Sequence, residues 1–241
     1  MTLLVVLPTY NERPNLERAA EQILRYPWAR LLVVDDASPD GTGQIADTLA
    51  ASSGGRIDVL HRTGPRGLGL SYIDGLRRAL SSGADAIVQM DADLSHDPAY
   101  LPDLAAALER FDLAIGSRYL RGVSVVNWPL HRIALSAFAN RYIRFVTGLE
   151  PHDCTSGFRA WRRDALAKLP LDRAETSGYA FLTEMLYEAA RLGCRIGEVP
   201  IVFVERREGY SKVSSSVLFE SLLTPWRLVL RGGRLKPRGS A

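Results

Sequence analysis

The stretch AIVQMDADLSHDP, residues 86–98, decides how the rest of the chain is interpreted. Its mostly apolar start, residues 86–90, predicts a buried β-strand that ends abruptly in carboxylates. Side chains two residues apart in an extended chain point the same way, so Asp91 and Asp93 would both face one hard cation or one hydroxylated ligand. An isolated Asp-x-Asp is more often a polar strand end that caps the next helix. Its meaning therefore depends on what the other strand ends carry.

The composition is that of a globular protein with one principal domain. The 241 residues are 46% hydrophobic, enough to bury a full core in one large domain or in one domain with a terminal extension. The net charge of +3 is uneven, because five basic and no acidic residues occur from Arg227 onward. The excess charge is confined to a tail, which excludes a basic stripe for nucleic acid. No nucleic-acid partner is expected.

The two cysteines and the first residues bear on location. Cys154 and Cys194 are far apart and have neither zinc nor redox spacing, so a reducing cytoplasm is the expected setting. The chain starts directly on an apolar strand, without the features of a signal peptide. No apolar run approaches the roughly 18–20 residues that span a bilayer. We therefore expect a cytoplasmic protein.

Strands and helices alternate through the first half of the chain. Apolar runs typical of strands occur at residues 2–7, 31–34, 57–60, 86–90 and 113–115. Segments with helical periodicity, about 10–15 residues long, separate them. This alternation predicts an α/β fold with a mostly parallel central sheet flanked by helices.

The second half follows a different pattern. We expect helices over residues 131–146 and 179–192, with the segment 158–161 between them, and a strand at 201–204. A last apolar helix covers residues 218–230, where Pro225 would kink or divide it.

Polar groups suited to a nucleotide follow three of the predicted strands. Pro8, Tyr10 and Glu12 follow the first, Asp36 follows the second, and the Asp-x-Asp follows the fourth. Open α/β sheets bind ligands at this edge, where Tyr10 would stack on a base and a carboxylate would accept from base or ribose. The first strand lacks the glycine fingerprint of dinucleotide-binding oxidoreductases, which disfavours that class. The loop GPRGLG at 64–69 matches no phosphate-binding motif and is expected to be a flexible turn.

Six ordered motifs resemble those of one enzyme family. They are LPTYNER at 7–13, VDDASPDGT at 34–42, MDADLSH at 90–96, GSRY at 116–119, SGFR at 156–159 and EVPI at 198–201. This set is similar to the dolichol- or polyprenol-phosphate mannose synthases, which are inverting glycosyltransferases of family 2 with a GT-A fold. The bacterial members of that group are most similar, with Asn127-Trp128-Pro129 among the shared details. The likeness extends from Val5 to about Lys212.

The resemblance implies transfer of mannose from GDP-mannose to a polyprenyl or dolichyl monophosphate, with Mg²⁺ or Mn²⁺ as cofactor. It assigns the donor to residues at the predicted strand ends and in a later loop: Pro8, Tyr10, Glu12, Asp36, Asp91, Ala92, Asp93, Arg206 and Lys212. Asp93 would bind the metal, and Ser95 stands where some members have a metal-binding Gln. Arg118 and Arg132 would meet phosphate groups of the donor or the acceptor. Asp91, Asp93 and Arg118 are the expected catalytic residues.

One departure leaves the sugar open. Ser177 stands where many members of the family have Lys, so either Arg173 or another cation substitutes for it or the sugar specificity differs. Glucose or another hexose is the alternative donor sugar. A catalytically inactive nucleotide-sugar-binding subunit of a membrane complex is disfavoured, because Asp93 and the arginines are retained.

An anionic acceptor requires cations more than it requires a base. A lipid monophosphate has a second pKa near ~6, so its nucleophilic oxygen is already charged at neutral pH. Two unit charges ~4 Å apart repel by ~4 kcal/mol at an effective dielectric of about 20, which favours a site rich in cations. Glu184, near the position of the base in relatives with hydroxyl acceptors, is assigned to sugar binding or packing. His96 is expected in a turn or a supporting role.

The C-terminal region is expected to reach a membrane. Residues 1–212 form the predicted catalytic domain, and residues 213–241 an amphipathic helix with a basic tail. At ~1 kcal/mol per Lys or Arg near an anionic surface, the five cations would contribute up to ~5 kcal/mol. Packing of the first half of this helix on the sheet is the alternative. We expect a peripheral protein on the cytoplasmic face, held by the membrane surface or by a separate membrane-anchor protein.

Overall fold

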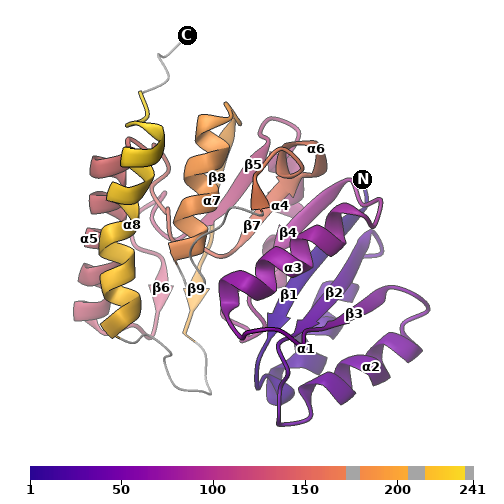
Figure 1. Ribbon diagram of the computed structural model, residues 1–241. Coiled ribbons are helices and arrows are strands. Elements are labelled where there is room, and N and C mark those ends of the chain that lie inside the picture. The colour runs from indigo at the N-terminus through magenta and orange to yellow at the C-terminus, as the bar shows by residue number, and fades with distance from the viewer. Residues whose placement is uncertain (172–179, 206–214, 237–241) are drawn as a thin grey trace.

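A seven-stranded sheet forms the centre of the described structure, with the strand order β3-β2-β1-β4-β7-β5-β8 (Figure 1). The computed structural model describes residues 1–171, 180–205 and 215–236, of which 215–221 are described as backbone only. The strands of this sheet are β1 (Leu3–Thr9), β2 (Ala29–Asp35), β3 (Ile57–His61), β4 (Ala86–Gln89), β5 (Leu113–Ser117), β7 (Arg159–Arg162) and β8 (Ile196–Pro200). All neighbouring strands are parallel except β7, which runs antiparallel to β4 and β5. The predicted α/β fold with a mostly parallel sheet is confirmed.

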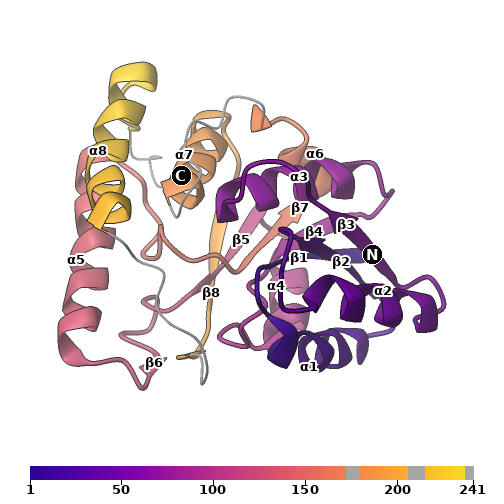
Figure 2. The same cartoon turned by 60° about the horizontal axis from the view of Figure 1, so that its bottom comes forward.

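Helices cover both faces of the sheet and the end beyond β8 (Figures 1 and 2). They are α1 (Arg13–Leu24), α2 (Thr42–Ser52), α3 (Leu68–Leu80), the short η1 (Pro98–Tyr100), α4 (Leu101–Ala107), α5 (Leu130–Thr147), α6 (Arg163–Leu166), α7 (Ala180–Arg191) and α8 (Ser215–Gly232). Helices α5 and α8 lie side by side at the end of the molecule opposite α1 and α2 (Figure 2).

Strand β1 shows why the first half of the chain forms a buried sheet. Every residue of Leu3–Thr9 is buried, as is typical of parallel strands covered on both faces. Alternate side chains enter two separate hydrophobic clusters, Leu4 and Val6 beside α3, and Val5 and Leu7 beside α1. The period of two thus divides the core between the faces of the sheet.

Helix α3 approaches the sheet most closely at Gly75. A Cβ atom at this position would lie 2.6 Å from Val6 Cγ1 and 2.8 Å from Val34 Cγ2. Only glycine permits this approach, which brings α3 down onto β1 and β2.

The strand ends that carry the predicted donor residues are neighbours. The register pairs Thr9 with Asp35 and Val6 with Gln89, so the carboxyl ends of β1, β2 and β4 lie next to one another. This adjacency confirms that the polar groups after these strands share one edge of the sheet.

The strand predicted at 201–204 forms over β9 (Phe203–Val204), which pairs with β6 (Val125–Val126) in a separate two-stranded sheet. The last strand of the central sheet is β8, which the sequence did not indicate. The β8 segment reads IGEVP, and its Gly, Glu and Pro are depleted in strands. Pairing with β5, rather than local propensity, therefore places it in the sheet.

Helix α8 continues through Pro225, so the predicted division does not occur. A proline inside a helix removes one backbone hydrogen bond, and packing of α8 against α7 and α5 offsets that loss. Tyr142 of α5 donates its hydroxyl to the carbonyl oxygen of Leu222 at 2.8 Å. Within the described ranges, no helix combines the length and the apolar character needed to cross a bilayer.

Candidate active site

The ends of β1, β2 and β4 enclose a cavity of about 280 Å³. Its lining includes all of the residues that the resemblance assigns to the donor at these strand ends: Pro8, Tyr10, Glu12, Asp36, Asp91, Ala92 and Asp93. Three loops that are far apart in the sequence therefore meet around one space, as the rule for open α/β sheets predicts.

Hydrogen bonds join the first loop of the cavity to the second. The backbone N–H of Asn11 donates to Ser38 Oγ at 3.1 Å, and that of Glu12 donates to Thr42 Oγ1 at 3.1 Å. Asn11 adopts a left-handed backbone with φ 58°, which few residues other than glycine do. Asn15 Nδ2 donates to Glu12 Oε2 at 2.9 Å. The loop is thus held in a conformation that carries Glu12 at the cavity.

Asp36 is buried and held by two groups that the sequence analysis missed. Arg62 Nη1 donates to Asp36 Oδ1, and the backbone N–H of Gly67 donates to Oδ2 at 2.9 Å. Arg62 is itself buried, and its Nε donates to Asp74 Oδ2 at 2.7 Å. Arg62 directly follows β3, so the strand-end rule applied to the third strand would have identified it.

The glycine-rich loop forms one wall of the cavity, a role that its sequence did not indicate. Arg62 Nη2 donates to the carbonyl oxygen of Pro65 at 3.1 Å and so holds the loop. The guanidinium of Arg66 lies 5.0 Å from the centre of the Tyr10 ring and donates to the Tyr10 hydroxyl. Arg66 and Tyr10 therefore form a cation–π pair at the cavity.

Asp91 is oriented by two buried aromatic side chains. Tyr72 Oη donates to Asp91 Oδ1 at 2.8 Å, and burial together with the charge of Asp91 raises the pKa of Tyr72 well above 10.0. The backbone N–H of Asp91 donates to His96 Nδ1 at 3.1 Å. The His96 ring stacks on Phe158 with centroids 5.0 Å apart. His96 thus supports the loop, as expected.

Asp93 and Ser95 form a tight turn at the mouth of the cavity. The backbone N–H and the hydroxyl of Ser95 both donate to Asp93 Oδ1, at 3.1 and 2.5 Å. No group of three His, Cys, Asp or Glu side chains that could hold a metal occurs in the part of the chain that the structure describes. A hard cation at Asp93 would therefore take further oxygen ligands from a bound diphosphate, which is how Mg²⁺ commonly binds in nucleotide sites. The carboxylates of Asp91 and Asp93 suit such a cation.

Arg118 is nearly buried against a carboxylate 35 residues away in the chain. Its Nε and Nη2 donate to Asp153 Oδ2 and Oδ1, each at 2.7 Å, and Nη2 also donates to Thr155 Oγ1. Burial alone would lower the pKa of Arg118, but the charges of Asp153 and, more weakly, of Asp91 raise it. Glu198 in β8 accepts from the backbone N–H of Asp153 at 3.0 Å and fixes this loop. Arg118 does not line the cavity at the strand ends.

Arg132, at the start of α5, shares an aromatic cluster with Arg118. Its guanidinium pairs with Glu205 and lies 4.2 Å from the centre of the Trp128 ring. The Arg118 guanidinium lies 5.6 Å from the same ring and 5.5 Å from Phe203. The structure therefore brings the two predicted phosphate-binding arginines together.

The remaining residues singled out in the sequence lie outside the cavity or outside the described residues. Glu184 of α7 is buried and pairs with Arg231 of α8 at 3.1 Å, which corresponds to the packing role. Arg206 and Lys212, like Ser177 and Arg173, lie outside the described residues.

Arg159 is a buried cation whose role the sequence did not indicate. Its side chain is fully buried, and its guanidinium donates to the carbonyl oxygens of Ser156, Leu182 and Cys154. Burial lowers the pKa of Arg159 to about 10. Arg159 thus joins the loop that holds Arg118 to the first turn of α7, a long-range contact with no local sequence signal.

Comparison with known proteins places the chain in a family. The model of glycosyl transferase family 2 matches residues 4–169. Polyprenol monophosphomannose synthase of Mycolicibacterium smegmatis is 44% identical over 98% of this chain and 90% of its own length. Undecaprenyl-phosphate mannosyltransferase of Micrococcus luteus is 46% identical over 99% of both chains.

Solved structures share the fold. The mannosyltransferase of Pyrobaculum calidifontis, in complex with GDP-Man and Mn²⁺, superimposes with a TM-score of 0.63 at 21% identity, covering 98% of this chain and 66% of that one. Glucosyl-3-phosphoglycerate synthase of Mycobacterium tuberculosis, in complex with Mn²⁺ and UDP, gives 0.64 at 22% identity, covering 98% and 81%. The expected GT-A arrangement is confirmed. The chain therefore belongs to glycosyl transferase family 2 and is a glycosyltransferase.

Proposed function

We propose that this enzyme transfers mannose from GDP-mannose to a polyprenyl monophosphate and so forms a lipid-phosphate-linked mannose. Two relatives with 44% and 46% identity bear names that combine a polyprenyl acceptor with mannose, which supports both halves of the proposal. The observation that carries it is a cavity lined by Asp91 and Asp93 beside two arginines that lie against the Trp128 ring. Phe203 contacts both Trp128 and His96, and His96 accepts from the backbone N–H of Asp91. A donor diphosphate and an anionic acceptor require this pairing of groups.

The donor occupies the cavity at the strand ends. Tyr10 contacts the base, and the carboxylates of Glu12 and Asp36 accept from base N–H or ribose hydroxyl groups. Asp91 and Ala92 lie against ribose and sugar, and Asp93 holds the cation. Mg²⁺ or Mn²⁺ bound there would neutralise the leaving diphosphate. Arg206 and Lys212, which lie outside the described residues, are assigned to the donor through the resemblance alone.

The acceptor needs no general base. A lipid monophosphate is already anionic at neutral pH, because its second pKa is near ~6. Glu184 lies near the position where relatives with hydroxyl acceptors have their general base, and here it forms an ion pair with Arg231. Bringing two unit charges to ~4 Å costs ~4 kcal/mol at an effective dielectric of about 20, which Arg118 and Arg132 offset. Those two arginines bind the acceptor phosphate.

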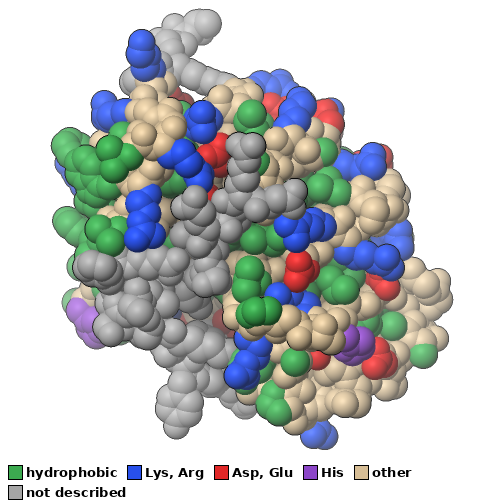
Figure 3. Space-filling view, in the orientation of Figure 1, with side chains coloured by type: hydrophobic (Ala, Val, Ile, Leu, Met, Phe, Trp, Pro, Cys, Tyr) green, Lys and Arg blue, Asp and Glu red, His purple; other side chains and the backbone are tan. Residues whose placement is uncertain are grey.

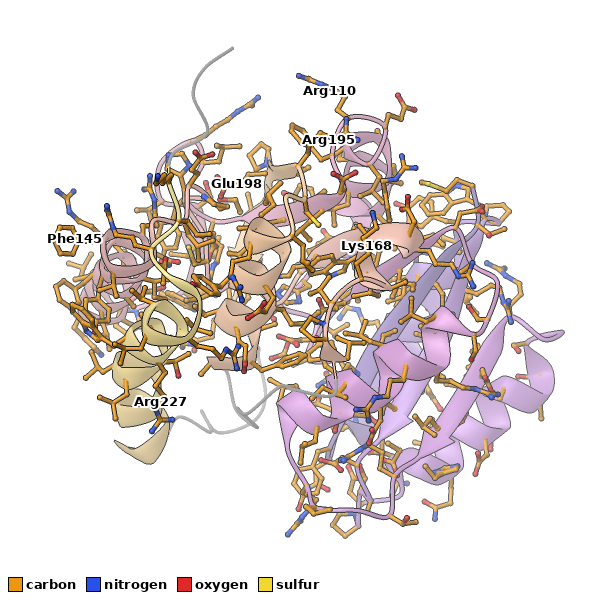
Figure 4. The ribbon with its side chains drawn as sticks, turned by 45° about the horizontal axis from the view of Figure 1, so that its top comes forward. Arg110, Phe145, Lys168, Arg195, Glu198 and Arg227 are labelled. Atoms are coloured by element: carbon orange, nitrogen blue, oxygen red, sulfur yellow. The ribbon has the colours of Figure 1, made fainter. Side chains whose placement is uncertain are left out.

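A mixed apolar and basic face on α5 and α8 meets the membrane. Leu130, Phe145 and Leu230 have 83%, 73% and 85% of their surface exposed. Several exposed apolar side chains on one pair of helices are typical of an interaction surface. Phe145 projects outward from α5 in Figure 4, and apolar and basic side chains gather over both helices in Figure 3. Exposed basic side chains on and after α8 include Arg227 and Arg234. This charge fits an anionic bilayer, and the attachment then includes α5 of the catalytic domain, residues 1–212, together with residues 213–241.

Vesicle sedimentation tests the membrane face. The double variant Phe145→Glu with Leu230→Glu is expected to lose binding to phosphatidylglycerol vesicles while keeping the wild-type circular dichroism spectrum. The control Gln44→Glu with Ala51→Glu adds the same two negative charges at exposed positions of α2, at the opposite end of the molecule, and should bind as wild type (Figure 1). Wild-type binding by the double variant, or binding only when a membrane protein is supplied, would overturn direct docking to lipid.

A donor and acceptor panel tests the reaction. Purified enzyme is incubated with Mg²⁺ or Mn²⁺, one of several labelled nucleotide sugars, and a short polyprenyl phosphate. Mannosyl lipid from GDP-mannose is the expected product. Glucosyl or another hexosyl lipid would select the alternative sugar, and absence of any lipid product would refute the acceptor class.

A further inference from the structure

Trp128 carries a buried hydrogen-bond donor that has no acceptor. It lies between β6 and α5, where Asn127 adopts a left-handed backbone with φ 67° and Pro129 caps the helix. The indole Nε1 of Trp128 is buried and makes no hydrogen bond to any part of the chain that the structure describes. Because buried donors are nearly always satisfied in proteins, this N–H group is suited to donate a hydrogen bond to a bound ligand.

Two guanidinium groups lie against the same ring. The Arg132 guanidinium is 4.2 Å and the Arg118 guanidinium 5.6 Å from the ring centre of Trp128. Each arginine already has a carboxylate partner, Asp153 for Arg118 and Glu205 for Arg132. The ring therefore fixes two cations beside one buried N–H group.

The cluster lies next to the groups that hold the donor sugar in the proposed function. Phe203 contacts Trp128 edge-on at 5.4 Å and His96 at 5.6 Å, and His96 Nδ1 accepts from the backbone N–H of Asp91 at 3.1 Å. The N-terminal end of α5, an 18-residue helix, follows Trp128 directly and adds the positive end of its dipole. Cations, a helix N-terminus and a buried N–H group together suit an anion.

We propose that Trp128 Nε1 donates a hydrogen bond to a phosphate oxygen of the acceptor, while its ring holds Arg118 and Arg132 beside that phosphate. The inference rests on the proposed function for the acceptor class, a phosphate monoester with an apolar chain, and is independent of the sugar. Trp128 forms and breaks no covalent bond. It fixes the phosphate so that a non-bridging oxygen faces the donor sugar.

Nuclear magnetic resonance of the full chain with ¹⁵N-labelled indole groups tests the hydrogen bond without requiring turnover. The chain has four tryptophans, and the Trp128→Phe variant identifies one of the four indole signals. Geranyl phosphate, added in the presence of GDP and Mg²⁺, should move the Trp128 indole proton downfield. Geraniol, which lacks the phosphate, should not, and inorganic phosphate shows whether the anion alone suffices.

Trp161 provides an internal control. Its Nε1 donates to Gln89 Oε1 at 2.7 Å inside the core, so its signal should stay in place in every titration and in the Trp128→Phe variant. A retained Trp161 signal also shows that the variant is folded.

Kinetics give the second measurement. Losing one hydrogen bond to a charged oxygen predicts about a tenfold higher KM for polyprenyl phosphate in Trp128→Phe, with an unchanged KM for GDP-mannose. If geranyl phosphate does not change the chemical shift of the Trp128 indole proton, the inference is overturned. A wild-type KM for the acceptor in Trp128→Phe would overturn it as well. If the wild type makes no lipid product, the proposed function fails, and the indole titration still decides whether Trp128 binds a phosphate monoester.

Discussion

Replacing Tyr72 by phenylalanine removes a single hydroxyl from beneath the candidate active site. That hydroxyl donates to Asp91 Oδ1 at 2.8 Å, and the ring is fully buried beside Phe181, with centroids 6.4 Å apart. Phenylalanine keeps the ring and its packing. The substitution therefore tests whether the orientation of Asp91 matters for transfer.

The expected loss follows from the chemistry of this hydrogen bond. A hydrogen bond to a charged group contributes ~1.5–3 kcal/mol. The Asp91 side chain is 30% exposed, so water replaces part of the interaction and the lower figure applies. About 1.5 kcal/mol corresponds to roughly a tenfold drop in kcat/KM for the donor. Because the pKa of Tyr72 lies well above 10.0, the hydroxyl stays protonated and the drop should be the same at about pH 6 and about pH 9.

Steady-state transfer assays with varied GDP-mannose measure this loss. Tyr187→Phe is the matched control, since its hydroxyl is also bonded but donates to the carbonyl oxygen of Gly233 beside α8. The control should keep the wild-type kcat/KM. Wild-type kcat/KM in Tyr72→Phe, or an equal loss in both variants, would refute the positioning role of Tyr72.

Three further predictions concern stability and are measured by urea denaturation. The Arg159→Lys variant should have a free energy of unfolding lower by about 3 kcal/mol or more. One ammonium group cannot replace a guanidinium group that donates to three buried carbonyl oxygens. The Gly75→Ala variant should have a free energy of unfolding lower by ~1–3 kcal/mol, because the added Cβ would lie 2.6 Å from Val6 Cγ1. The hydrogen bond with Asp47 raises the pKa of His61 above 6.5, so its stabilisation is complete below that pH and disappears as the pH rises through the raised value. His61 is 48% exposed, so the difference between wild type and His61→Gln should shrink by only a few tenths of a kcal/mol from about pH 5.5 to pH 8.5. An unchanged free energy of unfolding in Arg159→Lys or Gly75→Ala, or a His61 difference that grows with pH, would contradict the corresponding contact.

The core of the fold could be predicted because the pattern of each central strand lies within one short stretch of sequence. β1 and β2 contain unbroken apolar runs at residues 3–7 and 31–34, β4 contains one at 86–88, and polar residues follow each run. Parallel strands in one sheet place such ends together, so the convergence of Tyr10, Asp36 and Asp91 followed from the pattern alone. The resemblance then supplied the chemistry of the donor.

The β8 strand escaped prediction because its propensity is poor and its partner is distant. Its Gly197, Glu198 and Pro200 favour a loop, whereas the register with Ser117 and the other residues of β5 makes it an edge strand. The two-residue β9 lies within the strand predicted at 201–204, because Phe203 and Val204 have high strand propensity.

The supporting residues of the site were missed for a similar reason. Arg62 binds Asp36, which is 26 residues away, and Tyr72 binds Asp91, which is 19 residues away. The sequence pattern predicts only that Tyr72, on an apolar helix face, packs in the core. The fold shows that its hydroxyl donates to a carboxylate. Arg118 was identified by its motif, but its pairing with Asp153 depends on the loop after α5.

Replacement of Asp93 by asparagine is the most direct test of the central claim. Asn keeps the Oδ1 acceptor for the two Ser95 donors, at 3.1 and 2.5 Å, and removes only the charge that would hold the cation. The measurement is the rate at which labelled mannose moves from GDP-mannose to a polyprenyl phosphate with saturating Mg²⁺ or Mn²⁺. We predict formation of mannosyl lipid by the wild type and a rate at least ~100-fold lower in Asp93→Asn. Equal rates in the two proteins would contradict the account.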